Sequence, residues 1–207
     1  MNYLAHLWLT EQAGLPLPGA ILGDLVRGRL DGRFPPALER SIQLHRRVDV
    51  VTDSHPLIVA QRAGFGPGAR RYAGIVLDLV HDHALALDWE HHSGESLKLF
   101  ARRSAQAVAA EKEGFRLAGT GSPSAWRFRR LLLSYAGAGG IDHAMHRVAS
   151  RLRQPQPLLE AGRDWRALLP RVRADLPRLL GDLREAALGF AAEGGGEASA
   201  SGAGLLA

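Results

Sequence analysis

Carboxylates and imidazoles recur at helical spacing in the segment VLDLVHDHALALDWEHH. Asp78, His81 and Asp82 stand at i, i+3 and i+4, so on a helix all three share one face. Two carboxylates one turn apart among apolar neighbours repel each other, and burial raises that cost unless a cation lies between them. Carboxylate and imidazole ligands suit manganese, iron, magnesium or zinc. The segment therefore predicts either a divalent-metal site or the solvent-exposed face of an amphipathic helix.

A second row of such residues lies in the segment LHRRVDVVTDSH. His45, Asp49 and Asp53 follow one another at i, i+4 and i+8 along one helix face, with Arg46 on an adjoining face. A solvated stripe with local pairing explains one such row. Two rows on separate long helices favour a site more strongly, because packed helices can aim both rows into one pocket.

The third constellation is GDLVRG, in which Asp24 and Arg27 stand one turn apart. Taken alone, the two residues are typical of an ion pair on a short helix. As one wall of an acidic metal pocket, Asp24 would bind the metal and Arg27 would hold a phosphate oxygen with its forked guanidinium. Gly23 and Gly28 permit close approach of the backbone.

Several other chemistries lack the residues they need. The chain has no cysteine, which excludes disulfides, thiolate metal sites and a nucleophilic thiol. It has no G-x-S-x-G elbow, no Walker loop and no G-x-G-x-x-G after a strand. The first residues, MNYLAHLWLT, do not resemble a signal peptide, and no stretch approaches the ~20 apolar residues of a membrane span. We therefore expect a soluble, cytoplasmic protein.

The composition predicts an all-α protein, because Leu, Ala and Arg dominate over β-branched residues. A chain of 207 residues with 46% hydrophobic content suits one compact domain, which we place at residues 1–190. The glycine-rich end, 191–207, is expected to be a disordered tail. Helices are expected over residues 3–12, from 20 to about 28, from 36 to a stop at 56, over 70–91, and over 163–190 with an interruption at Pro170 or Pro177.

The motifs NYLAHLWL, GDLVRG, FPP, HRRVDVVTD and LDLVHDHAL occur in an order and spacing that resembles the bacterial acyl carrier protein phosphodiesterases. The resemblance is strong over roughly residues 1–90 and weaker beyond. It implies a helical fold related to the HD-type metal phosphohydrolases. It also implies hydrolysis of the phosphodiester between phosphopantetheine and a serine of holo acyl carrier protein, giving apo carrier protein and free phosphopantetheine. The expected cofactor is a divalent metal, foremost Mn²⁺, with Mg²⁺, Fe²⁺ and Co²⁺ as alternatives.

The resemblance also assigns roles to individual residues. As metal ligands it implies Asp24, His45, Asp78 and Asp82, and its third motif, D-x-x-x-D-H, does not require a histidine at position 81. Arg27 and Arg46 are expected to offset the charge that develops on the phosphate oxygens. His83 or His6 is expected either to protonate the leaving serine oxygen or to orient a metal ligand. Asp49 and Asp53 are expected to orient His45 or Arg46.

The net charge of +5 is compatible with an acidic partner, although an arginine-rich composition also follows from a GC-rich genome. Because acyl carrier proteins are acidic, the stripe WRFRR (126–130) and Arg70–Arg71 are candidate docking residues, with ordinary solvated arginines as the alternative.

An HD-like phosphohydrolase of nucleotides or other small phosphoesters is the alternative function. A carrier-protein binder without catalysis is a further one. A nucleic-acid-binding module is disfavoured because the acidic residues cluster and the basic ones are dispersed, and no membrane partner is expected.

Overall fold

The computed structural model describes the backbone of residues 1–200 and the side chains of residues 1–193. Every regular element in that part of the chain is a helix, which confirms the all-α prediction. The α-helices, with one 3₁₀ turn at Arg70–Tyr72 between α4 and α5, are α1 (Tyr3–Gln12), α2 (Gly19–Leu25), α3 (Pro36–Ser54), α4 (Pro56–Ala63), α5 (Ala73–Leu87), α6 (Trp89–His92), α7 (Leu97–Ala110), α8 (Lys112–Leu117), α9 (Ala125–Ser134), α10 (Ala138–Ala149), α11 (Gln156–Ala161) and α12 (Trp165–Ala200).

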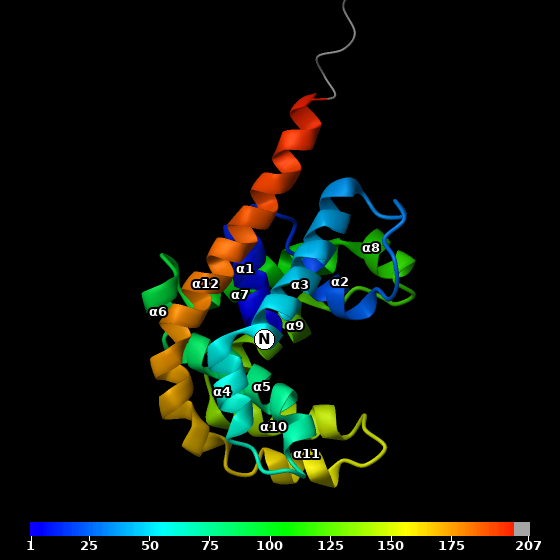
Figure 1. Ribbon diagram of the computed structural model, residues 1–207. Helices are drawn as coiled ribbons and strands as arrows, with labels where there is room; N and C mark the ends of the chain where they lie inside the picture. The colour runs from blue at the N-terminus through cyan, green and yellow to red at the C-terminus, as the bar shows by residue number, and fades with distance from the viewer. Residues whose placement is uncertain (201–207) are drawn as a thin grey trace, which may run out of the picture.

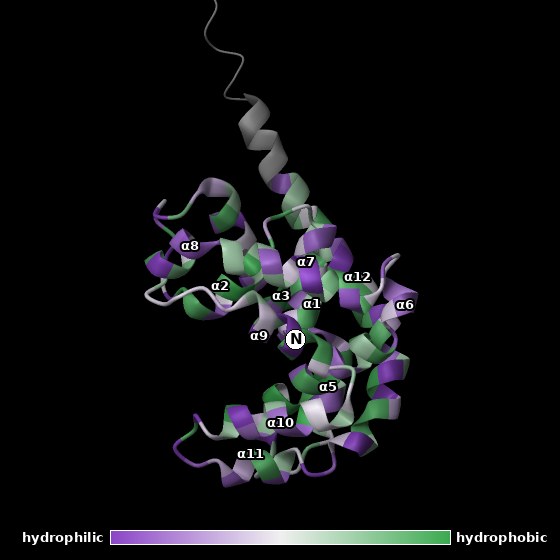
Figure 2. Cartoon of the chain, turned by 180° about the vertical axis from the view of Figure 1, so that it is seen from behind, coloured by the Kyte–Doolittle hydropathy of each residue, from purple (hydrophilic) through white to green (hydrophobic). Residues whose placement is uncertain are grey.

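Two views from opposite sides give the arrangement of these helices (Figures 1 and 2). The helices α2, α3 and α8 gather at one end of the molecule, and α10 and α11 at the other. The first residue lies between the two ends, close to α9. Along one side runs α12, which packs on α3 and α5. Among the described residues, no helix combines the length and apolarity needed to cross a membrane.

Local signals set the bounds of α1 and α3 as predicted. Asn2 caps α1 by accepting a hydrogen bond from the Tyr3 N–H. Pro36 occupies the first turn of α3, where a missing N–H costs nothing. Pro56 does end α3 after Ser54, but it also starts α4, so the chain turns at His55 rather than entering a loop.

The expected helix over 70–91 is divided in the structure. It consists of the 3₁₀ turn, the α5 helix and the short α6 helix, with a break at Asp88. The Asp88 carboxylate accepts hydrogen bonds from Arg173 of α12, which fixes this break against the long helix. The acidic and histidine-rich motif therefore lies on α5 alone.

The predicted interruption of the last helix is wrong, because α12 continues through both Pro170 and Pro177. A proline inside a helix costs about 3 kcal/mol or more. Burial of an apolar stripe that faces α3 and α5 offsets this cost: Val172, Leu176, Leu179, Leu180 and Leu183 are all at most 1% exposed. The helix also takes in residues 191–200, where we expected a tail, and the rest of that tail, 201–207, lies outside the described residues.

Two glycines allow α2 and α3 to approach each other closely. A Cβ added at Gly19 would lie 2.1 Å from Ser41 Oγ, and one at Gly23 would lie 2.2 Å from the His45 ring. Both distances are shorter than any van der Waals contact, so only glycine fits at these positions. The spacing of four residues puts both glycines on the α2 face that meets α3. This contact brings the end of α2 beside His45.

Candidate metal centre

His45 and Asp49 form the centre of the site on α3. They are one helical turn apart, and His45 Nε2 lies 3.2 Å from Asp49 Oδ2. His45 is 2% exposed, whereas the Asp49 side chain is 44% exposed. The pair therefore joins a buried imidazole to a carboxylate at the surface, as the i, i+4 spacing predicts for one helix face.

The second imidazole comes from α1, where His6 is buried against α3. Its Nε2 lies 3.1 Å from Asp49 Oδ1, so the two carboxylate oxygens of Asp49 contact two different histidines. The rings of His6 and His45 are stacked, with centroids 4.0 Å apart and an angle of 20° between their planes. The crossing of α1 over α3 thus adds a ligand atom to the pair.

Asp24, near the end of α2, adds a second carboxylate. Its Oδ1 lies 3.4 Å from His45 Nε2, and the side chain is 51% exposed. The other ring nitrogen of His45, Nδ1, lies 2.8 Å from the backbone oxygen of Ala20. A histidine held in this way directs Nε2 toward its ligand, as the partners of metal-binding histidines commonly do. The close α2–α3 contact at Gly23 makes this geometry possible.

The charges around these groups shift their pKa values in opposite directions. Burial lowers the pKa of His45, but its hydrogen bonds with Asp24 and Asp49 outweigh burial and raise it to about 9. Burial and the neighbouring charge of His45 lower the pKa of His6 to about 4. Burial also acts to raise the pKa of Asp49, yet its contacts with His45 and His6 hold it well below its usual value. At neutral pH these pKa values place the positive charge on His45 rather than on His6.

The donor set suits a divalent metal. One ligand atom each from His6, His45 and Asp49 can be chosen so that all three lie within 4.8 Å of one another. Two imidazoles and a carboxylate are ligands that zinc, iron and manganese accept. Both imidazoles direct Nε2 toward Asp49, so a cation bound there would displace the proton that charged His45 holds. Asp24 stands close enough to His45 to serve as a further oxygen donor.

The two acidic residues of α5, both expected as ligands, have other partners in the structure. Asp78 Oδ1 lies 2.9 Å from the Met1 amino group. Asp82 is fully buried and accepts hydrogen bonds from the backbone N–H groups of Leu4 (2.7 Å) and Ala5 (3.2 Å). Both carboxylates thus share one face of α5, as predicted, but that face holds the beginning of α1. Burial is the main cause that raises the pKa of Asp82, to about 7.

Of the two arginines expected to bind phosphate, one is exposed and one is anchored. Arg27 is exposed, three residues after Asp24. Arg46 donates to the backbone oxygens of Val26 (2.7 Å) and Gly28 (2.8 Å). It therefore fixes the segment that follows α2 and carries Arg27. Gly28 has a φ of 78°, a left-handed conformation that favours glycine.

The last two expected residues lie away from the histidine cluster. Asp53 is exposed and pairs with Arg62 of α4 at 2.5 Å. His83 is buried, with Nδ1 2.5 Å from the Tyr135 backbone oxygen and its ring edge-on to Trp165, 5.1 Å between centroids. These contacts tie α3 to α4 and α5 to the C-terminal helices.

The sequence as a whole matches one family model. The model is described as acyl carrier protein phosphodiesterase, and it matches residues 1–183. The chain belongs to the acyl carrier protein phosphodiesterase family.

Individual relatives in this family match only part of the chain. A protein named acyl carrier protein phosphodiesterase from Serratia proteamaculans is 50% identical over 90 residues, which are 44% of this chain and 47% of that protein. One of the same name from Photorhabdus laumondii is 44% identical over 90 residues, which are 44% of this chain and 46% of that protein. One from Klebsiella pneumoniae is 39% identical over 109 residues, 52% of this chain and 56% of that protein. These matches span about half the length of the curated relatives. No solved structure matches the chain, so the likeness to HD-type phosphohydrolases stays a prediction.

Sequence reasoning named every member of the cluster but did not group them. His6 stands alone in an apolar helix, and nothing in its neighbourhood signals that it faces His45. The family resemblance supplied His6 as a proton donor or as a group that orients a ligand, not as a ligand itself. The only local signal was the i, i+4 spacing of His45 and Asp49. Conversely, His81 had a favourable spacing, yet it is buried with Nδ1 2.7 Å from the Leu77 backbone oxygen.

Proposed function

We propose that this protein hydrolyses the phosphodiester between phosphopantetheine and the serine of holo acyl carrier protein, with a divalent metal, foremost Mn²⁺, as cofactor. Family membership supplies the reaction, and the cluster of His6, His45 and Asp49 is the observation that supports a metal-dependent route. Products are apo carrier protein and free phosphopantetheine. The reaction belongs in the cytoplasm, where fatty acids are made on carrier proteins.

The metal would be held by His6, His45 and Asp49, with Asp24 as an additional oxygen ligand. When bound, a divalent ion supplies a Lewis acid for the phosphate and lowers the pKa of water toward neutrality. Two buried imidazoles and two half-exposed carboxylates leave one side of this group open toward solvent. A phosphodiester carried by a protein partner can approach from that side.

The remaining residues bind or position. Arg27 is exposed beside Asp24 and would neutralise charge on the non-bridging phosphate oxygens. Arg46 holds the Val26–Gly28 segment by two hydrogen bonds and so positions Arg27. Asp78 and Asp82 position His6 by fixing the start of α1. His83 and Asp53 are assigned structural roles through their contacts with Tyr135 and Arg62.

Intact-mass spectrometry of holo acyl carrier protein tests this function. The carrier protein is incubated with the enzyme and Mn²⁺, with chelator, or with Asp49→Asn in place of the wild type. Loss of the phosphopantetheine mass only with metal and wild-type enzyme is the expected result. An unchanged carrier mass with metal-loaded enzyme contradicts it. Cleavage of nucleotides or other small phosphoesters by the same sample would then establish the alternative.

A further inference from the structure

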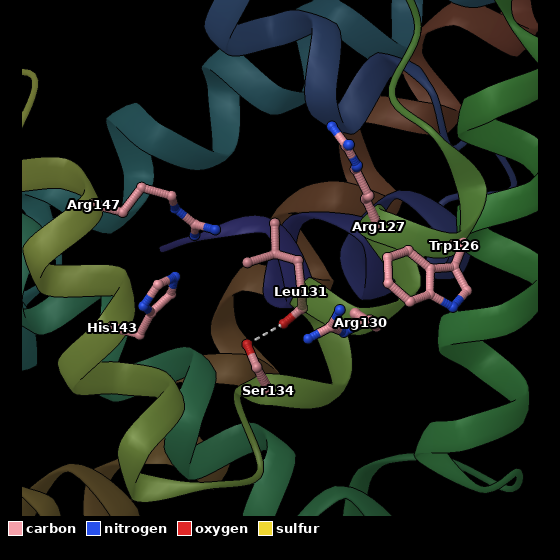
Figure 3. A pocket seen from close by; sticks show the side chains of 7 residues that line it. All are labelled: Trp126, Arg127, Arg130, Leu131, Ser134, His143 and Arg147. Atoms are coloured by element: carbon pink, nitrogen blue, oxygen red, sulfur yellow. Dashed lines mark hydrogen bonds between the residues drawn. The ribbon is translucent and has the colours of Figure 1, made fainter.

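A basic pocket lies between α9 and α10, outside the histidine cluster (Figure 3). It has a volume of about 320 Å³. Arg127 and Arg130 line it from α9, and His143 and Arg147 line it from α10. The guanidinium of Arg147 extends from its helix toward α9. The two helices thus place positive side chains on facing walls, and no carboxylate lines the pocket.

These arginines have no acidic partner within the described residues. Arg127, Arg130 and Arg147 take part in none of the ion pairs there, whereas Arg103, Arg166 and other arginines do. Like charges facing each other across a pocket repel, which disfavours the folded state. An anionic partner would remove that repulsion, so the pocket is complementary to one.

An exposed aromatic ring adds an apolar component to this charge. Trp126, which also lines the pocket, is 62% exposed. No large apolar side chain of the described residues is more exposed. The guanidinium carbon of Arg130 lies 4.6 Å from the centroid of its ring. Such stacking holds the arginine in place while its N–H donors stay free. Tryptophan and arginine together are typical of the residues that dominate protein–protein binding.

Tyr3 joins the helix that carries His6 to one helix of the pocket. Tyr3, on α1, lies against Phe128 of α9 with ring centroids 6.0 Å apart. Burial, followed by the charge of Asp24, raises the pKa of Tyr3, and the charge of Arg147 opposes this. The Tyr3 side chain thus senses the charge of Asp24 and that of an arginine of the pocket. A partner seated on the pocket would lie against α9, which packs on the helix that carries His6.

We propose that the α9–α10 pocket is where the acidic surface of the carrier protein docks. The proposal rests on the function proposed above and adds the location of the partner. The pocket is lined by Trp126, Arg127, Arg130 and Arg147, among others, so it includes part of the WRFRR stripe and adds the facing wall of α10, which the sequence did not indicate. An acidic partner surface would offer carboxylates to both walls.

Binding of apo acyl carrier protein, measured by calorimetry at low salt, tests the docking site independently of catalysis. The variants are Arg127→Glu with Arg130→Glu on one wall, Arg147→Glu on the other, and Arg70→Glu as the matched control. Arg70 is exposed, takes part in none of the ion pairs among the described residues, and belongs to the other candidate docking residues, Arg70–Arg71. Mn²⁺ affinity and the melting temperature are measured on each variant to show that the fold and the metal centre are intact.

We expect the variants on each wall to weaken carrier binding at least about tenfold. Arg70→Glu should bind the carrier protein as the wild type does, and the Mn²⁺ affinity should be unchanged in every variant. Equal weakening by Arg70→Glu, or no weakening by either wall, overturns the proposal. Loss of binding to vesicles containing anionic phospholipid, with carrier binding intact, also overturns it and assigns the pocket to a membrane surface. Failure of the wild type to hydrolyse holo carrier protein would refute the proposed hydrolysis but not the docking site, because binding of apo carrier protein is measured separately.

Discussion

Two helices each carry a polar pair at i, i+4 spacing, and the pairs have different partners. On α3, His45 and Asp49 face His6 and stay open to solvent at the carboxylate. On α5, Asp78 and Asp82 face the start of α1, and Asp82 is fully buried. Spacing of i, i+4 fixes which side chains share a face, but the helix opposite decides what they bind. Backbone N–H groups and an amine satisfy the α5 carboxylates in the structure.

The electrostatic states of the two regions differ accordingly. The pKa of Asp49 is held low because imidazoles contact both of its oxygens. The pKa of Asp82 is raised to about 7 because burial outweighs the backbone N–H groups that it accepts from. A metal-binding carboxylate must be ionised, so Asp49 is prepared for a cation and Asp82 is not. Four predictions test this contrast.

The largest effect on stability is expected from Asp82→Ala. The substitution leaves the N–H groups of Leu4 and Ala5 buried without acceptors, at a cost of about 1–3 kcal/mol each. Urea unfolding measures the loss. Asp82→Asn, which keeps one acceptor oxygen, should lose less. If Asp82→Ala keeps its stability but no longer binds Mn²⁺, the α5 pair is a metal site after all.

Asp49→Asn should mainly affect metal binding. It keeps the shape of the side chain but removes the charge between His6 and His45. We expect Mn²⁺ affinity to fall at least about 100-fold, beyond the usual effect of a group that only orients a ligand. Calorimetry with Mn²⁺ measures it, and Asp53→Asn on the same helix is the matched control. Equal losses in both variants would contradict the assignment of the centre to Asp49.

Gly23→Ala tests the close contact that places α2 beside His45. The added Cβ would overlap the ring, and overpacking of this kind costs about 1–3 kcal/mol. Chemical denaturation should show the loss, together with weaker Mn²⁺ binding. Gly181→Ala on α12 is the control, since its Cβ meets no atom within 4 Å. It should stabilise the protein by about 0.4–1 kcal/mol. Equal stability of the two variants would show that α2 can move away freely.

The effect that is smallest at any one step is a pH dependence of the metal affinity, about tenfold per pH unit. The pKa of His45 is raised from 6.5 to about 9 in the folded, metal-free protein. Its charged form therefore contributes stability that is complete below pH 6.5 and lost as pH rises through 9. Because metal must displace that proton, Mn²⁺ affinity should rise about tenfold per pH unit over this window.

Calorimetry from pH 6.5 to 8.5 measures this slope. Asp24→Asn, which removes one carboxylate that raises the His45 pKa, should shift the rise to lower pH. A flat profile in the wild type would show that His45 carries no proton to displace.

The sequence was most informative where the determining contacts are local. Helical periodicity predicted α1, and Pro36 and Pro56 marked the two ends of α3. The i, i+4 spacing placed His45 beside Asp49. It failed at Pro170 and Pro177, because burial against α3 and α5 holds α12 together across both prolines. It did not pair His6 with His45 either. That contact depends on how α1 crosses α3, and no local pattern encodes a crossing.

The hydrogen bonds from Leu4 and Ala5 to Asp82 also have a consequence for synthesis on the ribosome. The helix that carries His6 emerges before α5, and the acceptor for its opening N–H groups follows 77 and 78 residues later. At about 5–20 residues per second, several seconds separate the two. During that interval the nascent chain holds His6 without the anchor that orients it. The metal centre can therefore be completed only after α5 has left the exit tunnel.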